Sequence, residues 1–418
     1  MDARAMMRRL FEAAVAAADP ERALEGRLPE RPSGRTVVVG CGKGAAQLAA
    51  AFDRLWDGPL EGTVVTRYGY ACPAGRIEVL EAAHPEPDAA GLRAAERLLA
   101  QVAGLGPDDL VVALVTGGGS ALLPAPAAGM TLEDEIAVNR GLLAGGAPIS
   151  AMNLIRKHLS RIKGGRLALA AKPARVATLV VSDIPGDDPS LVASGPTVPG
   201  AGGRAEALAA VRRWRLDLPE AARRALESAE APSPEDPRLA GDTVEVIASA
   251  RLSLEAAARA AEAEGLPAVI LSDAMEGEAR EIGRAHGAIA REVALRGRPF
   301  APPVAMLSGG ETTVTLGEGG GRGGRNGEFA LSLAQDVAGL PVTALAADTD
   351  GIDGSEDNAG AFADGDTWRR LREAGADPGA LLAGHDSWGA FDRLGDLFTT
   401  GPTGTNVNDF RAVLIRPR

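Results

Sequence analysis

The chain has 418 residues, which is more than a single hydrophobic core usually holds, so two domains are expected. A net charge of −12 argues against a nucleic-acid surface, and an aromatic content of 3% leaves too few rings for a base-stacking platform. No apolar run approaches the roughly 20 residues that cross a bilayer, the amino terminus reads as an amphipathic helix, and two cysteines offer no disulfide framework. These features predict a soluble cytoplasmic protein with no nucleic-acid or membrane partner.

Apolar strand-like runs alternate with helical stretches rich in Ala, Leu and Arg along the chain. Long helices are predicted at Ala89–Val102 and Ser253–Glu264. The strands are predicted, in chain order, at Thr36–Val39, Gly62–Thr66, Leu110–Thr116, Val176–Ser182, Val244–Ala248, Ala268–Ser272, Val304–Ser308 and Val342–Ala346. Because these strands are almost continuously apolar, they predict parallel sheet covered by helices on both faces.

A segment rich in prolines and acids, Glu230–Asp242, marks the predicted domain boundary. We expect a larger α/β domain over residues 1–235 and a smaller one over residues 240–418. A crevice between two such domains is a common place for a small-molecule ligand, so the active site is expected there.

The first chemical signal is the segment VVVGCGKGAA at Val37–Ala46. Its G-x-G-x-x-A spacing satisfies a permissive dinucleotide-binding fingerprint, but the next predicted strand leads into Arg67 without the acid that NAD requires. Arg67 suits the 2′-phosphate of NADP, whereas Lys43 within the turn suits a phosphoryl group in transfer. The segment therefore predicts phosphate binding at Gly42 and Lys43 and leaves a nicotinamide enzyme and a kinase both open.

Three consecutive glycines and a serine follow another predicted strand. Gly117, Gly118 and Gly119 allow a ligand to approach the backbone closely. Ser120 suits a carboxylate or phosphate ligand, with capping of the next helix as the alternative.

Lysine is rare in this chain, because only four of its 44 basic residues are lysines. A surviving lysine is therefore a candidate for a place that needs a compact ammonium group. Lys157 and Lys163 lie with Arg156 in the basic segment Met152–Ala168, where spacings of three and four residues share a helix face. These three residues are predicted to bind an anion, with a solvated charged face as the alternative.

Acidic residues gather where two predicted strands end. Asp183 is delivered by a buried strand and suits Mg²⁺ or the proton of a substrate hydroxyl, and Asp188 follows on a turn. Asp350 and Asp353, close to Asp348, resemble a site for a hard cation. Asp188, Asp350 and Asp353 are the predicted metal ligands.

A glycine-arginine loop that begins at Gly319 leads into an apolar helix. Arginine neutralises phosphate through a bidentate fork, and the glycines let the backbone wrap a ligand. Arg325 and Asn326, at the start of the helix, are therefore predicted to bind phosphate.

Taken together, these segments resemble those of the class II glycerate kinases, the MOFRL group. The motifs run in family order over nearly the whole chain: GKGAA, HPEPD (His84–Asp88), GGGSALL, RKHLSRIKGGRLA, SDIPGDDPSLVASGPT, SGGETTVT, TDGIDG and GPTGTNVND. The resemblance implies a larger Rossmann-like, doubly wound amino-terminal domain and a smaller MOFRL-type α/β carboxyl-terminal domain. It also implies phosphoryl transfer from ATP, with Mg²⁺, to D-glycerate, giving 2-phosphoglycerate.

On this resemblance, Lys43 and Arg325 stabilise charge on the transferring phosphoryl group, and Asp183 orients or deprotonates the substrate hydroxyl or positions Mg²⁺. Replacing Lys43 or Arg325 by alanine is expected to depress turnover and leave the fold intact. Asp348 stands where the family pattern has glycine, which adds charge beside the supposed metal site. A homodimer stays open, and the alternatives are an NADP-dependent hydroxypyruvate reductase and a non-catalytic sugar-phosphate sensor.

Overall fold

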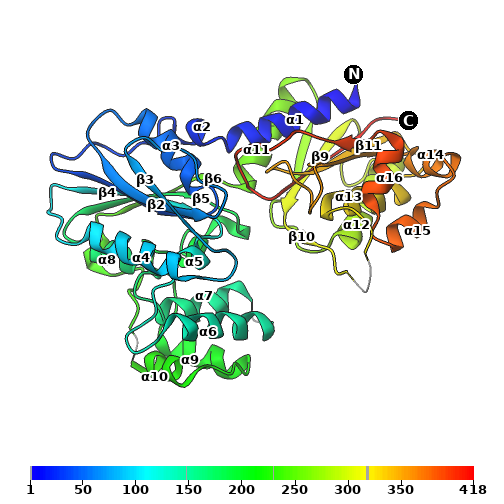
Figure 1. Ribbon diagram of the computed structural model, residues 1–418. Coiled ribbons are helices and arrows are strands. Elements are labelled where there is room, and N and C mark those ends of the chain that lie inside the picture. Colours follow the sequence, from blue (N-terminus) through cyan, green and yellow to red (C-terminus); the bar gives the residue numbers. More distant parts are fainter. Residues whose placement is uncertain (1, 147, 229, 317–319) are drawn as a thin grey trace. The chain divides into compact units, whose positions relative to one another are not determined.

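The computed structural model describes residues 2–146, 148–228, 230–316 and 320–418, so Gly319 of the predicted loop lies outside the described residues. The chain divides into two compact units (Figure 1). The amino-terminal unit comprises Ala23–Ile247, and the carboxyl-terminal unit combines Met1–Arg22 with Ala248–Arg418. The division falls within helix α2 (Pro20–Leu24) and at the end of strand β6 (Thr243–Ala248).

A six-stranded sheet forms the centre of the amino-terminal unit. Its strand order is β3-β2-β1-β4-β5-β6, and the neighbouring pairs from β3 to β5 are all parallel. The other strands are β1 (Thr36–Cys41), β2 (Glu61–Arg67), β3 (Ile77–Ala82), β4 (Leu110–Thr116) and β5 (Arg175–Val181). This is the order of a doubly wound, Rossmann-like sheet, in which the chain reverses direction of travel between β1 and β4.

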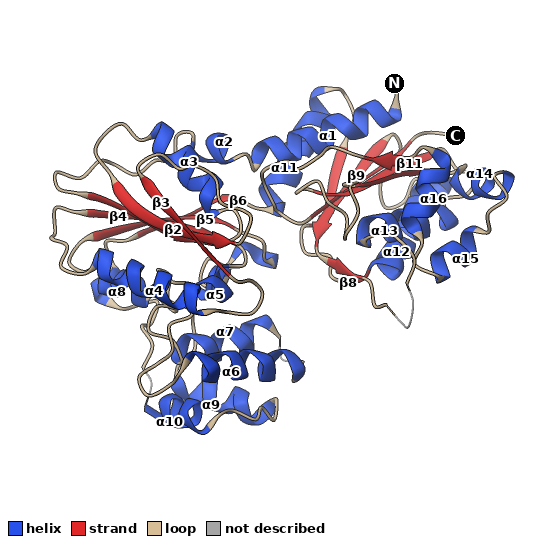
Figure 2. Cartoon of the chain, in the orientation of Figure 1, coloured by secondary structure: helices blue, strands red, loops and turns tan. Residues whose placement is uncertain are grey.

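Helices cover both faces of this sheet, as the apolar strands predicted. Every residue of β1 and β4 is buried, so neither strand has a face left for solvent. Helix α3 (Ala45–Leu55) lies on one face, and α4 (Ala89–Val102), α5 (Gly119–Leu122) and α8 (Arg166–Ala170) lie on the other (Figure 2). A Rossmann-like first domain is therefore confirmed.

A group of helices packs around its own small core within the same unit. It contains α6 (Leu132–Ala144), α7 (Ile149–His158), α9 (Arg204–Arg213) and α10 (Glu220–Ser228). Val138, Leu142, Ile155 and Leu226 are among the buried residues that these helices share. This layer holds the predicted basic segment at the end of α7.

The carboxyl-terminal unit contains a second six-stranded sheet, of order β13-β12-β11-β14-β9-β7. Within the described residues of this sheet, β7 and β9 pair in parallel and the other neighbouring strands pair antiparallel. The prediction of parallel sheet is therefore wrong for this unit. The predicted strand at Val342–Ala346 lies in a strand that is buried along its whole length, and burial on both faces does not reveal strand direction. The strands are β7 (Ala268–Ser272), β9 (Val304–Gly310), β11 (Val342–Asp348), β12 (Gly360–Asp364), β13 (Leu397–Phe398) and β14 (Asp409–Ile415), beside a small pair of β8 (Gly277–Glu278) and β10 (Thr312–Thr313).

Two hydrophobic cores lie against the two faces of this second sheet. One core contains α12 (Ala279–Arg296) and α13 (Arg325–Asp336), with α14 (Thr367–Glu373), α15 (Pro378–Ala383) and α16 (Ser387–Leu394) nearby; the other contains α1 (Ala3–Ala17) and α11 (Ala250–Ala263).

The first helix belongs to the unit formed by the carboxyl-terminal half of the chain. Met6, Leu10 and Phe11 of α1 are buried, and the Phe11 ring meets those of Phe398 and Phe410 edge-on at 5.0 and 5.8 Å. The predicted assignment of residues 1–235 to one domain differs from the structure at this helix, because amphipathicity shows that a helix needs a partner surface without showing which.

None of the helices in the described parts of the chain is long and apolar enough to cross a membrane.

Candidate active site

Five loops of the amino-terminal unit leave the carboxyl ends of neighbouring parallel strands. Lys43 follows β1, Arg67 ends β2, His84 follows β3, the Gly117–Ser120 loop follows β4 and Asp183 follows β5. Parallel strands end at one common edge, and open α/β sheets bind ligands there, at the point where strand order reverses. The structure therefore brings four separate sequence motifs, and Arg67 besides, to one edge of the sheet.

The backbone amides of the first glycine turn are already used by the protein. The Gly42 N–H donates to a carbonyl of β2 at 3.1 Å, the Lys43 N–H to the Gly117 carbonyl at 2.8 Å, and the Gly44 N–H to the Thr116 hydroxyl at 3.1 Å. Gly42 is needed for close packing, since a Cβ there would lie 2.1 Å from the Thr116 Oγ1. The expectation that Gly42 cradles phosphate is not supported, and the Lys43 side chain is what this turn presents.

The Lys43 ammonium has no carboxylate within salt-bridge distance among the described residues. Its side chain lies beside Gly118, where an added Cβ would be 3.0 Å from the Lys43 Cγ and 3.1 Å from the His84 Nε2. Burial, together with the charges of Lys43 and Arg67, lowers the pKa of His84 to about 4. A neutral imidazole thus lies close to two cations.

Asp183 faces the first glycine of the triple-glycine loop. A Cβ on Gly117 would lie 1.8 Å from the Asp183 Oδ2, so only glycine leaves room for this carboxylate. Further along the loop, the Ser120 and Ser194 hydroxyls lie 2.6 Å apart, and the Ser194 hydroxyl donates to the Asn153 Oδ1 at 2.9 Å. The expected set of Gly117, Gly118, Lys43 and Asp183 is therefore brought together.

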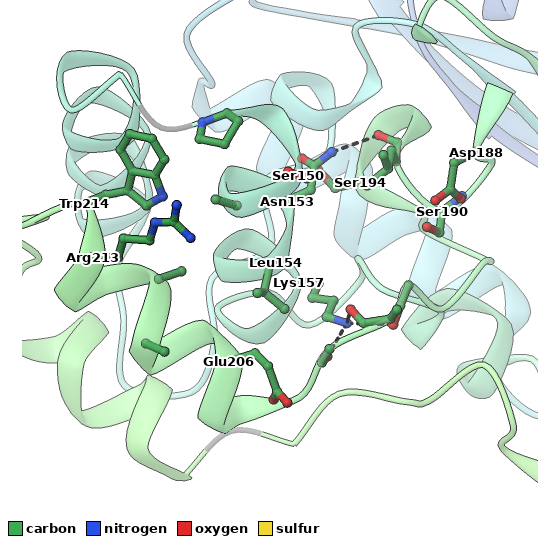
Figure 3. Close-up of a pocket in the computed structure, with 18 residues that line it drawn as sticks. Ser150, Asn153, Leu154, Lys157, Asp188, Ser190, Ser194, Glu206, Arg213 and Trp214 are labelled. Carbon is green, nitrogen blue, oxygen red and sulfur yellow. Dashed lines mark hydrogen bonds between the residues drawn. The ribbon is translucent and has the colours of Figure 1, made fainter. Parts of the chain in front are cut away.

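Lys157 is held by backbone carbonyls rather than presented to a ligand. Its ammonium donates to the carbonyls of residues 200, 201 and 202 at 2.7, 2.7 and 2.6 Å. It lines a pocket of about 630 Å³ between α7, α9 and the loop at 188–202, whose wall also carries Ser190 and Trp214 (Figure 3). All three N–H donors of the ammonium are used, so Lys157 holds the loop at residues 200–202 in place.

Lys163 and Arg156 are also engaged inside the unit. The Lys163 ammonium is 1% exposed and lies 2.7 Å from the Glu135 carboxylate. Arg156 donates to the Asn139 side chain at 2.8 Å, and burial lowers its pKa. The predicted anion-binding role of these two basic residues is not supported, because Arg156 on α7 and Lys163 in the turn after it are both bonded to side chains of α6.

In the carboxyl-terminal unit, Arg325 is surrounded by carboxylates. Its guanidinium donates to Asp409 at 2.7 Å, to Asp348 at 2.7 Å and to Glu311 at 2.8 Å. Burial alone would lower the pKa of Arg325, but the charges of the three carboxylates raise it overall. The Glu311 side chain is 56% exposed whereas that of Asp409 is fully buried, so Glu311 is the partner most easily exchanged for an external anion.

Asn326 and Asp353 hold the start of helix α13. Asp353 is 1% exposed, and its two oxygens accept the backbone N–H groups of Asn326 and Gly327 at 2.9 and 2.8 Å. Burial raises the pKa of Asp353 to about 6, although these two hydrogen bonds act in the opposite direction. Asn326 is fully buried and donates to Asp409 at 2.9 Å, so the expectation that it binds phosphate is not supported.

The predicted metal ligands differ in how well they fit a cation. In the parts of the chain that the structure describes, no three His, Cys, Asp or Glu side chains cluster closely enough to hold a metal ion by themselves. The Asp353 oxygens are occupied by helix α13, and Asp188 belongs to the other unit. Asp350 is half-buried and next to Asp348, and a single carboxylate of this kind fits a Mg²⁺ ion that is held mainly by nucleotide phosphates.

Two members of these clusters, His84 and Asp409, were not among the predicted site residues. His84 lies in the HPEPD motif and Asp409 in the GPTGTNVND motif. Both motifs were recognised in the sequence, but no chemical role was predicted for either side chain. Their roles depend on neighbours that are distant in the sequence.

Two family models match the chain. The family model described as a domain of unknown function, DUF4147, matches residues 6–227, and the MOFRL family model matches residues 304–409. The chain is 56% identical to a protein from Agrobacterium vitis named "Putative hydroxypyruvate reductase", over 99% of this chain and 95% of that protein. It is 38% identical to the glycerate 2-kinase of Pyrococcus horikoshii, over 99% and 98% of the two chains.

The fold comparison leads to the same group of proteins. A crystal structure of a glycerate kinase from Thermotoga maritima matches with a TM-score of 0.90 at 36% identity, covering 97% of this chain and 98% of that chain. Both the sequence match and the fold match extend over nearly the full length. The chain belongs to the class II glycerate kinase family, in which a DUF4147 domain precedes a MOFRL domain.

Proposed function

We propose that this protein transfers the γ-phosphoryl group of ATP to the 2-hydroxyl of D-glycerate and forms 2-phosphoglycerate. The observation that carries the proposal is the Lys43 ammonium, which has no carboxylate partner in the described residues and lies beside Gly118 at the carboxyl edge of the sheet. In an acidic protein whose other lysines are all bonded, such an ammonium is suited to a phosphoryl group.

The residues divide the chemistry between them. Lys43 and Arg325 stabilise negative charge on the phosphoryl oxygens during transfer. Asp183 accepts a hydrogen bond from the substrate hydroxyl, aligns its oxygen for attack on the γ-phosphorus, and takes its proton as the new P–O bond forms and the bond from phosphorus to the ADP oxygen breaks. Gly117 leaves the space in which this carboxylate stands.

Asp350 is the carboxylate that we assign to Mg²⁺. The ion supplies charge neutralisation to the nucleotide phosphates when it is bound. The Asp350 Oδ1 accepts a hydrogen bond from the Ile352 N–H at 2.8 Å, and this bond orients the carboxylate.

A coupled assay with purified protein, D-glycerate, ATP and Mg²⁺ tests the proposed function. We expect ADP release, and product NMR should show the phosphorus coupled to the proton at carbon 2. Phosphorus at carbon 3 would contradict the position, and no ADP release with any hydroxy acid would contradict the kinase.

An NADP-dependent hydroxypyruvate reductase is the second candidate, because the Agrobacterium vitis relative carries that name. A dinucleotide pyrophosphate needs free amides at the glycine turn. The amides of Gly42, Lys43 and Gly44 donate within the protein instead, which favours the kinase. NADPH oxidation with hydroxypyruvate in a parallel assay would reverse this preference.

Gly117→Ala is expected to lower kcat by roughly a hundredfold. The new Cβ would lie 1.8 Å from the Asp183 Oδ2, so the carboxylate must move away from the position that it needs for the substrate hydroxyl. Gly241→Ala is the matched control, because nothing lies within 4 Å of a Cβ at that position. Equal kcat values for the two variants, measured in the coupled assay, would remove Asp183 from the mechanism.

A further inference from the structure

The proposed reaction leaves two side chains at the same edge of the sheet without a role, Arg67 and His84. Arg67 is the last residue of β2 and pairs with Ala82, the last residue of β3, and His84 follows two positions later. The Thr66 hydroxyl donates to the Lys43 carbonyl at 3.0 Å, which ties the Lys43 turn to the end of β2. Three loops therefore place Lys43, Arg67 and His84 side by side.

Positive charge is uncompensated at this cluster. Among the residues that the structure describes, no carboxylate lies within salt-bridge distance of Lys43 or Arg67, and the Arg67 guanidinium stacks on the Tyr70 ring at 3.6 Å. Two neighbouring cations without a carboxylate partner favour an external anion. The His84 imidazole is neutral at pH 7, because its pKa lies near 4, and it offers one N–H donor to the same anion.

We propose that Arg67 and His84, next to Lys43, hold the carboxylate of a 2-hydroxy acid and thereby fix its hydroxyl beside Asp183. A planar guanidinium matches a carboxylate through two parallel hydrogen bonds, which a lysine cannot reproduce. This assignment rests on the proposed function and names the part of the acceptor that this edge of the sheet recognises.

The spacing of the loop selects this class of acceptor. Gly118 faces Lys43 and His84, whereas Gly117 faces Asp183, and consecutive Cα atoms are about 3.8 Å apart. A 2-hydroxy acid carries its carboxylate and hydroxyl on adjacent carbon atoms, so the two groups match the two sides of the loop.

Steady-state kinetics with D-glycerate and ATP varied separately test the assignment. Arg67→Met should raise KM for D-glycerate by about tenfold to a hundredfold, with KM for ATP within about twofold of the wild type. Arg67→Lys should give an intermediate KM, and His84→Gln, which keeps an N–H donor, should be closer to the wild type than His84→Ala. Arg97→Met is the control, since that exposed arginine pairs with Glu78 at 3.6 Å. An increase in KM for ATP alone would assign the cluster to the nucleotide and overturn the proposal.

Calorimetric binding to the intact protein separates this proposal from the kinase activity. The wild type should bind D-glycerate more tightly than 3-hydroxypropionate, which lacks the adjacent hydroxyl, and more tightly than the methyl ester of D-glycerate, which lacks the anionic carboxylate. In Arg67→Met the ratio of the Kd of the ester to the Kd of the acid should fall by about tenfold. If the wild type binds the acid and the ester equally, the proposal fails even where turnover of glycerate is normal. If turnover is absent but the preference holds, the kinase assignment fails and the carboxylate site stands.

Discussion

Lys43→Met should lower kcat with D-glycerate and ATP by about a thousandfold while leaving thermal stability close to that of the wild type. The ammonium is the charge that the first glycine turn presents, because the amides of that turn are bonded within the protein. Methionine keeps the length of the side chain and removes the charge. The substitution should hardly change stability, because no carboxylate of the described residues loses an ion-pair partner.

Lys157→Met is the matched control and should show the opposite behaviour. Its ammonium satisfies the carbonyls of residues 200, 201 and 202, so its loss leaves acceptors without donors and lowers the melting temperature. The kcat of the folded fraction should stay near the wild-type value. Both variants are measured in the coupled assay and by thermal unfolding. A large kcat loss in Lys157→Met with normal kcat in Lys43→Met would show that the roles of the two lysines are reversed.

Arg325→Met should abolish most activity and also destabilise the carboxyl-terminal unit, by about 3–5 kcal/mol. Three carboxylates share this guanidinium, and two of them, on Asp409 and Asp348, have almost no access to solvent. Asp409 keeps the buried Arg411 as a partner, but Asp348 loses its ion-pair partner when the Arg325 cation is removed. This expectation corrects the one drawn from the sequence, in which loss of Arg325 affected turnover without affecting the fold.

A second substitution separates the two effects of Arg325. Arg325→Met combined with Asp348→Asn removes one buried negative charge and should restore part of the lost stability, but no activity. Urea unfolding followed by tryptophan fluorescence measures the first quantity, and the coupled assay measures the second. Recovery of activity in the double variant would show that Arg325 serves the fold and not the phosphoryl group. Unchanged stability in the single variant would show that the carboxylate cluster is neutralised in another way.

The strands of the amino-terminal unit could be predicted because local sequence determines them. Leu110–Thr116 is a strand with the predicted bounds, and the predicted helix at Ala89–Val102 is observed with the same ends. Continuous apolar runs reflect burial on both faces, and an Asp at the N-cap, here Asp88, marks a helix start within a few residues. The same reasoning missed strand β3 at Ile77–Ala82, in which two glutamates interrupt the apolar pattern.

The sequence identified many of the residues of the candidate site, but it did not reveal which other residues they bond to. Lys43, Gly117 and Asp183 were chosen from motifs that end strands, and parallel strands bring such motifs to one edge. The basic segment at the end of α7 was misleading, because a lysine that binds three carbonyls has the same local sequence as one that binds phosphate.

By itself, the sequence determined the strand–helix alternation, the family and the loops that carry charge, since these depend on residues close together in the chain. Only the tertiary structure decided which charges are already paired. Lys157 meets carbonyls from residues 200–202, Lys163 meets Glu135, and Arg325 meets Asp409 from the far end of the chain. Whether a charge can meet a ligand depends on which distant segments pair with it, and position along the chain does not report that.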